Sequence, residues 1–268
     1  GGAAVKHVGA IAGRELNSLF VSPVAYAVMT LFAVLAGFFF LSGVLQFQEY
    51  VIRLQSFQAM EQLEELNLND HVIAPFLHVM SVVLLFLVPG ITMGLFASEK
   101  SNGTLELLLT SPITIWELVI GKFLAAAAFV AILVLLLALF PAILFTYGDP
   151  ELGKTAAGLL GLLLIGVAYA SIGAFASSVT QSQFVAFFLA FVLLLVLWML
   201  GFLADLGAAG GAASSDAVGD LLRYLSTAEH FESIVMGLVD TKDLAYFAVI
   251  VVAFLTLTKA AVESVRWR

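Results

Sequence analysis

The eight residues GDPELGKT, from Gly148 to Thr155, match a spacing that binds phosphates in many nucleotide-binding proteins. In those proteins a loop joins a strand to a helix N-terminus. Backbone N–H groups, the Lys and the Ser or Thr hydroxyl then surround the phosphates and magnesium. Lys154 and Thr155 supply matching side chains, whereas Asp149 and Glu151 would repel a phosphate. An ATP-binding loop is one hypothesis, and a turn that begins a helix is the other.

His78 is a second candidate for chemistry. It lies about two turns into a long apolar segment, and ionisable groups inside membrane spans mark proton or ion pathways by default. No Asp, Glu, Arg or Lys accompanies it near the middle of that segment. A hydrogen-bonded packing role is therefore favoured over a proton relay, and an ion-coupled carrier that uses His78 is kept as an alternative.

The composition is that of a polytopic membrane protein. Hydrophobic residues make up 62% of the 268 residues and charged residues 11%, whereas soluble domains have about 45–50% and 25%. A net charge of −8 with eleven scattered Lys and Arg gives no basic face for nucleic acid. The absence of cysteine excludes disulfides, thiol catalysis and Cys-ligated metal. We expect an all-α integral membrane protein with no catalytic, cofactor-binding or metal site of its own.

Six apolar segments approach the length of about 20 residues that a bilayer-spanning helix needs. They are residues 24–44, 72–96, 118–147, 155–177, 184–203 and 244–262. Six spans place both termini on one side of the membrane, and Lys and Arg near the span ends indicate which side. Seven of the eleven Lys and Arg residues lie at the termini and in the 97–122 loop, so this face is predicted to be cytoplasmic. No charged segment with a cleavage site opens the chain, so we expect mature sequence there.

This topology decides between the two hypotheses for GDPELGKT. The segment links the third and fourth spans on the face away from cytoplasmic ATP, and a membrane helix precedes it in place of a strand. No apolar strand ending in a magnesium-binding Asp occurs elsewhere in the chain. We therefore predict a turn followed by a helix start, with Lys154 reaching toward the membrane interface.

Three segments outside the spans have helical patterns. Residues 1–22 carry apolar residues at helical spacing between charged ones. This pattern predicts an N-terminal interfacial helix or, alternatively, an early extension of the first span broken at Pro23. Residues 47–66 predict an outer helix, packed or solvated. The run 206–215 is a flexible link by composition, and residues 214–240 after it predict an extracytoplasmic re-entrant or interfacial segment.

Two features of the spans concern helix packing. Pro89-Gly90 predicts a kink in the second span, where freed backbone groups need neighbours. Small residues fall on one face of the fourth span at multiples of four, which allows close approach of neighbouring backbones. They are Gly158, Gly166, Ala170, Ala174 and Ser178.

The most unusual cytoplasmic stretch is EKSNGTLELLLTSPITIWELVIGK, residues 99–122. It begins with a polar turn ending in Gly103-Thr104, continues as a short apolar helix, breaks at Ser111-Pro112 and then restarts. One interpretation is an ordinary interfacial loop that holds two spans apart. The other is a short helix across the membrane face that is offered to a cytoplasmic partner.

The stretch GTLELLLTSPITIWELVIGKFLAA resembles the cytoplasmic coupling segment of type-two ABC exporter permeases, most closely the gliding-motility GldF group. Residues 14–40, residues 225–247 and the ending ESVRWR are similar to the same family in the same order. The resemblance implies six membrane helices, an N-terminal interfacial helix, a coupling helix at 99–117 and an outer re-entrant segment within one permease domain.

The resemblance also implies partners. ATP and magnesium would bind a separate cytoplasmic ABC ATPase dimer, and the chain would pair with a second permease subunit, either a copy or a relative with an outer domain. Both would lie among the lipids of a bacterial inner membrane. Relatives often have basic residues where this chain has Ser101-Asn102, so its docking charges depart from the pattern. The implied contacts with the ATPase are Arg14, Glu15, Glu99, Gly103, Thr104, Glu106, Thr110, Ser111 and Pro112. Of these, Arg14 and Glu15 would support the docking surface from the N-terminal helix.

Two functions from different classes fit these features. The first is a permease subunit driven by the separate ATPase through the coupling helix. The second is a mechanical or assembly element that transmits ATP-driven movement to extracytoplasmic partners through the outer loops and moves no solute. Apolar spans without polar clusters name no substrate.

Overall fold

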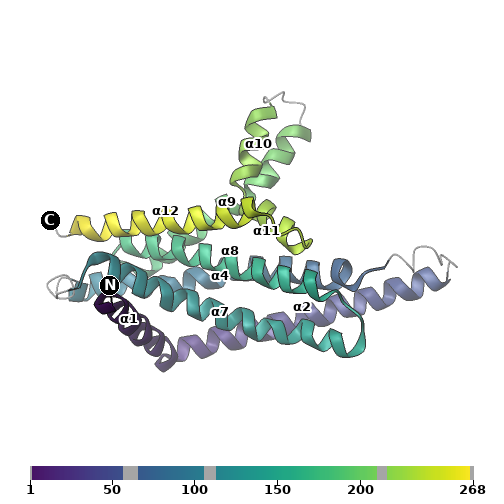
Figure 1. Ribbon diagram of the computed structural model, residues 1–268, viewed down its shortest axis with the longest axis horizontal. Coiled ribbons are helices and arrows are strands. Elements are labelled where there is room, and N and C mark those ends of the chain that lie inside the picture. The colour runs from purple at the N-terminus through teal and green to yellow at the C-terminus, as the bar shows by residue number, and fades with distance from the viewer. Residues whose placement is uncertain (1, 57–65, 106–112, 210–215, 266–268) are drawn as a thin grey trace.

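The computed structural model describes residues 2–56, 66–105, 113–209 and 216–265, and within these ranges it contains helices and no strand (Figure 1). In this part of the chain, six helical segments are long and apolar enough to cross a membrane. The expected all-α membrane fold with six spans is confirmed. The segments are Pro23–Ser56, Asn69–Ser101, Ile115–Tyr147, Leu152–Val179, Gln183–Leu206 and Thr241–Ser264.

The elements follow one another as a chain of helices with short connections. In order they are α1 (Gly2–Val21), α2 (Pro23–Ser56), η1 (Asn69–Ile73), α4 (Ala74–Thr92), α5 (Gly94–Ser101), α7 (Ile115–Tyr147), α8 (Leu152–Val179), α9 (Gln183–Ala209), α10 (Asp216–Leu225), α11 (Thr227–Val235) and α12 (Thr241–Val265). Figure 1 shows α4, α7, α8 and α12 side by side along the long axis, while α10 rises from the side of this bundle.

The two ends of the bundle differ in what they contain. The N-terminus, the end of α5, the start of α7 and the end of α12 lie together at one end, which we call the terminal end (Figure 1). The link between α7 and α8 and the far end of α2 lie at the opposite end. GDPELGKT and the described parts of the 99–122 stretch are therefore separated by the length of the bundle.

Helix α8 is the centre of the bundle because its small residues admit its neighbours. It contacts α4, α5, α7, α9, α11 and α12. A Cβ placed on Gly166 would come 2.6 Å from Val130 Cγ1 of α7, and one on Gly158 would overlap Leu77 of α4. Ala170 and Ala174 are fully buried. Larger side chains at these positions would hold the neighbouring helices apart.

The second span is interrupted where α4 gives way to α5. Pro89 lies inside α4, and the interruption itself falls one turn later, at Met93. Ser177 of α8 accepts hydrogen bonds from the backbone N–H groups of Phe96 and Ala97, both at 3.0 Å, and donates to the Met93 carbonyl at 2.8 Å. A hydroxyl from the central helix thus satisfies the backbone groups at this interruption.

Two boundaries differ from those expected. Helix α2 continues to Ser56, so the described part of the predicted 47–66 helix belongs to the first span, because no proline interrupts the chain after Pro23. Helix α12 begins at Thr241, which brings Asp243 into the last helix. Residues 57–65 and part of the predicted 206–215 link lie outside the described residues.

The close approach of α8 and α4 predicts a stability effect at Gly173, which the predicted small-residue face did not include. A Cβ at Gly173 would overlap the Thr92 side chain, whereas one at Gly153, in the same helix, meets nothing within 4 Å. We expect Gly173→Ala to lower the free energy of unfolding by about 1–3 kcal/mol through overpacking. Gly153→Ala should leave it unchanged or slightly raised. Thermal unfolding in detergent checks this, and equal stability of the two variants would contradict it.

Candidate functional site

Helix α1 packs against α7 at the terminal end. Ile11 lies against Gly121, where a Cβ would come 2.7 Å from Ile11 Cγ2, and the Phe20 ring lies 5.7 Å from that of Phe129. Helices α1 and α2 are separate, with the break at Ser22 directly before Pro23, and they diverge in direction (Figure 1). The apolar face of α1 is therefore occupied by another helix of the chain.

The start of α7 is held by a capping box. The Glu117 backbone N–H donates to Thr114 Oγ1 at 3.3 Å, and the Thr114 N–H donates to Glu117 Oε2 at 2.7 Å. This reciprocal pair satisfies backbone donors that a helix start leaves free. Glu117 Oε1 also lies 3.5 Å from His7 Nδ1 of α1. The helix restart after Pro112 is thus set locally and tied to α1.

A buried lysine joins three helices at this end, in what we call the ion cluster: Glu15, Glu99 and Lys122. Lys122 Nζ of α7 lies 3.0 Å from Glu15 Oε1 of α1 and 2.8 Å from Glu99 Oε1 of α5. Its side chain is 1% exposed and lies over the Phe96 ring, 5.5 Å from the centroid. A buried ammonium group is stable only with such partners.

An exposed arginine adds a second positive charge beside the two carboxylates of the ion cluster. Arg14 Nη2 lies 3.1 Å from Glu15 Oε1, and its side chain is 60% exposed. Glu99 Oε2 is buried and has no hydrogen-bond partner among the described residues. The Glu99 carboxylate therefore relies on Lys122, whose Nζ lies 2.8 Å from its Oε1.

The polar turn after α5 is built directly on this cluster. Gly103 has a φ of 69°, a left-handed conformation that favours glycine. Thr104 Oγ1 donates to the Glu99 carbonyl at 3.3 Å, and the Lys100 amine donates to the Ser178 carbonyl of α8. Gly103 and Thr104 are exposed. The turn thus presents a surface at the terminal end while its base contacts the central helix.

The structure brings together the five implied contact residues that it describes. Arg14, Glu15, Glu99, Gly103 and Thr104 all lie at the terminal end. Residues 106–112 of the implied coupling helix lie outside the described residues, and with them four other implied contacts: Glu106, Thr110, Ser111 and Pro112.

Sequence analysis missed Lys122, Glu117 and His7 as members of this site. The sequence did contain a signal for Lys122, namely a lysine close to the start of an apolar span. A lysine buried at such a position rarely lacks an acidic partner. The identity of that partner was not deducible, since Glu15 is 107 positions away in the chain.

The phosphate-loop match at the opposite end is used for helix packing. Asn69 accepts from the Glu151 backbone N–H at 2.7 Å and donates to the Glu151 carbonyl at 3.1 Å and to Thr155 Oγ1 at 3.0 Å. Lys154 Nζ lies 3.6 Å from Asp70 Oδ1 and 3.7 Å from Glu151 Oε2. As predicted, the segment is a link followed by a helix start, and Thr155 is buried.

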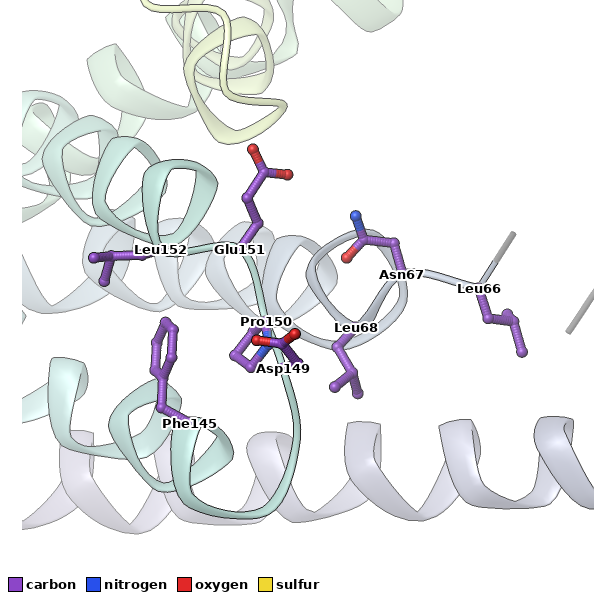
Figure 2. Close-up of a pocket in the computed structure, with 8 residues that line it drawn as sticks. All are labelled: Leu66, Asn67, Leu68, Phe145, Asp149, Pro150, Glu151 and Leu152. Atoms are coloured by element: carbon purple, nitrogen blue, oxygen red, sulfur yellow. The ribbon is translucent and has the colours of Figure 1, made fainter. Parts of the chain in front are cut away.

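An open pocket of ≈ 920 Å³ adjoins this link (Figure 2). Its charged lining residues are Asp149 and Glu151, which would repel a phosphate. No Lys or Arg is among its lining residues, so the pocket lacks the cation of a nucleotide site. It is lined by Leu66, Asn67, Leu68, Phe145, Asp149, Pro150, Glu151 and Leu152.

His78 packs edge-to-face against Phe231 of α11, with 5.3 Å between the ring centroids. It lines a pocket of ≈ 330 Å³ with Trp198 of α9 and Glu232 of α11. His78 thus has an acidic neighbour, Glu232, that comes from another segment and not from its own apolar span. The contact that the structure provides for the ring is aromatic packing.

Comparison with known proteins gives one match that covers almost the whole chain. A family model described as "ABC-2 family transporter protein" matches residues 9–263. No curated protein matches the chain.

Removal of the buried lysine should destabilise the protein far more than removal of the exposed arginine. Lys122→Met keeps the apolar stem but removes the cation that lies between Glu15 and Glu99. It leaves Glu15 only its exposed pair with Arg14, so we expect a loss of about 3–5 kcal/mol in unfolding free energy. Arg14→Gln should cost below about 1 kcal/mol, because its pair with Glu15 is exposed to solvent. Chemical unfolding of the purified variants measures both, and equal losses would show that the ion cluster does not hold α1 and α5 on α7.

Proposed function

Because the chain belongs to the ABC-2 transporter family and is a multi-pass permease subunit of an ABC transporter, we propose that a separate ATPase drives it from the terminal end. The observation that carries this proposal is the ion cluster. Lys122 connects α1, α5 and α7 directly beneath the exposed Gly103-Thr104 turn. A partner that presses on this turn therefore acts on three helices at once.

The contacts of α5 extend this movement to the centre of the bundle. The Lys100 amine bonds to the Ser178 carbonyl, and the Ser177 hydroxyl bonds to the backbone of Phe96 and Ala97. Since α8 touches α4, α7, α9, α11 and α12, displacement of α5 reaches most of the spans. Packed helices shift between discrete arrangements, so a small push at the turn becomes a rearrangement of the bundle.

The proposal also assigns the other parts of the transporter to separate subunits. ATP and magnesium bind the ATPase dimer, while this chain supplies the membrane path with a second permease subunit. Both termini face the cytoplasm of a bacterial inner membrane, and the chain belongs to the gliding-motility GldF group. Large apolar side chains exposed on α2, α9 and α12 face lipid or that second subunit, among them Phe38, Leu41, Phe188, Val192, Val249 and Val252.

A second candidate function is the mechanical or assembly element. It is favoured by α10, which stands off the bundle and exposes Val218, Leu221 and Tyr224 (Figure 1). Such a surface suits an extracytoplasmic partner protein. ATPase activity stimulated by a solute in liposomes supports transport, whereas activity governed only by a partner's outer domain supports the mechanical role.

The proposed orientation predicts opposite labelling of two exposed positions in a chain without cysteine. A membrane-impermeant maleimide should label Asp149→Cys on intact cells, because the α7–α8 link faces outward. Ser101→Cys should label only after permeabilisation, because the turn after α5 faces the cytoplasm. The reverse pattern would place GDPELGKT beside cytoplasmic ATP and overturn the orientation.

The proposed docking predicts loss of the ATPase when the turn at Gly103 changes shape. Valine is strained at a φ of 69°, so we expect Gly103→Val to weaken copurification of the ATPase on the order of tenfold. Gly103→Asn should retain binding, because asparagine tolerates this conformation. The matched control is Gly237→Val, with a φ of 86° near the opposite end, which should bind normally. Normal binding by Gly103→Val would remove this turn from the docking surface.

A further inference from the structure

A histidine and an aspartate are buried together where α11 meets α12. His230 Nδ1 lies 2.6 Å from Asp243 Oδ1, and the two side chains are 7% and 1% exposed. The expected last span began at residue 244, so Asp243 was counted outside it. The pair joins the segment before the last span to that span, in a bundle with few buried charges.

The second ring nitrogen and the ring faces of His230 also have partners. His230 Nε2 lies 3.0 Å from the Tyr224 carbonyl oxygen at the end of α10. The ring stacks on Tyr246 of α12 at 3.9 Å between centroids, and Tyr246 Oη donates to the Leu225 carbonyl at 2.7 Å. His230 therefore connects α10, α11 and α12 at one point.

These contacts determine how many protons the pair holds. A carbonyl oxygen only accepts, so Nε2 must carry a hydrogen to bond to Tyr224. The contact between Nδ1 and Asp243 Oδ1 needs a second hydrogen, on either the ring or the carboxyl group. In both cases the pair has one proton more than a neutral ring beside an ionised carboxylate. It is therefore neutral as a whole.

The nearby Arg and Lys side chains pair with other carboxylates, so they do not replace that proton beside Asp243. Asp243 Oδ2 is buried without a hydrogen-bond partner among the described residues. Arg223 Nη2 lies 2.8 Å from Asp205, and Lys242 Nζ lies 3.4 Å from Asp240. Loss of the proton would leave a buried negative charge facing a nitrogen lone pair. The ionisable groups that line the adjoining ≈ 360 Å³ pocket with the pair are Asp220, Arg223, Tyr224, Glu229 and Lys242.

We propose that His230 and Asp243 form a proton-binding site, and that the proton they share latches α10 and α11 onto α12. Helix α11 also packs against α8 and α9, so the latch fixes the position of a segment that three spans depend on. Release of the latch frees the N-terminus of α11 from the bundle. The proposal concerns this chain alone and does not depend on the ATPase.

The latch is tested by the accessibility of Thr227, the first residue of α11, which is 0% exposed. In a Thr227→Cys background, purified protein should react slowly with a maleimide. Adding Asp243→Leu should raise the labelling rate on the order of tenfold or more, as expected when a buried pair loses one partner. The matched control, Asp149→Leu, changes an exposed acidic residue in the α7–α8 link, outside this pocket, and should leave the rate unchanged.

The conservative variant keeps a hydrogen bond at Nδ1 but removes the carboxyl group. Asp243→Asn can donate from its amide to Nδ1 while Nε2–H still bonds to Tyr224, so we expect slow labelling. Labelling as fast as in Asp243→Leu would overturn a latch held by the hydrogen bond at Nδ1, and slow labelling in both variants would overturn the latch altogether. If Asp243→Leu does not accumulate, His230→Ala takes its place, because it leaves the carboxylate unpaired.

A spectroscopic measurement reports the proton directly. The wild-type protein should show a low-field proton resonance, as a short hydrogen bond produces, and ¹⁵N-labelled histidine shows whether this proton lies on Nδ1 of His230 or on the carboxyl group. The four histidines of the chain make assignment with His230→Gln practical. The resonance should be absent from Asp243→Asn although Thr227→Cys remains protected there. Its absence from the wild type would overturn the proposal.

Discussion

Lipid offers no hydrogen-bond partner, so polar groups inside this bundle depend on partners within the protein, and much of the structure follows from that constraint. Ser177 satisfies the backbone where the second span is interrupted, and Asn69 satisfies the link before α8. Lys122 has two carboxylates, and His230 has a carboxyl group and a carbonyl. Each of these contacts also joins different helices, so satisfying a polar group fixes the position of a span.

Helix α8 is where most of these requirements meet. Its small residues let α4 and α7 approach closely, and its serines and Thr155 supply hydroxyls at both ends. Larger side chains on α8 would keep neighbouring helices at a greater distance, and six of them could not pack around it. Under the proposed function, this arrangement would carry a contact at the terminal end to helices at the opposite end without a chain of charged residues through the membrane.

Chemistry is sparse in the described part of this chain, and its polar groups act by position. The match to a phosphate-binding loop shows the difference between spacing and surroundings. Asp70 pairs with the Lys154 side chain, Asn69 bonds to the Thr155 hydroxyl and the Glu151 N–H, and the adjoining pocket is acidic. A pattern of side chains performs chemistry only when the fold leaves those groups free to meet a ligand.

The sequence by itself determined the class of fold and the positions of the spans, because bilayer thickness and helical periodicity act on neighbouring residues. It also determined the break before Pro23, the restart of a helix after Pro112 and the small-residue face of α8, all of which are local. Tertiary structure alone decided that α7 covers the apolar face of α1, that Lys122 meets Glu15 and Glu99, and that His230 meets Asp243. The helical pattern shows which residues are apolar or charged, but a buried charge takes its partner from whichever helix packing brings near. That choice depends on the whole bundle at once.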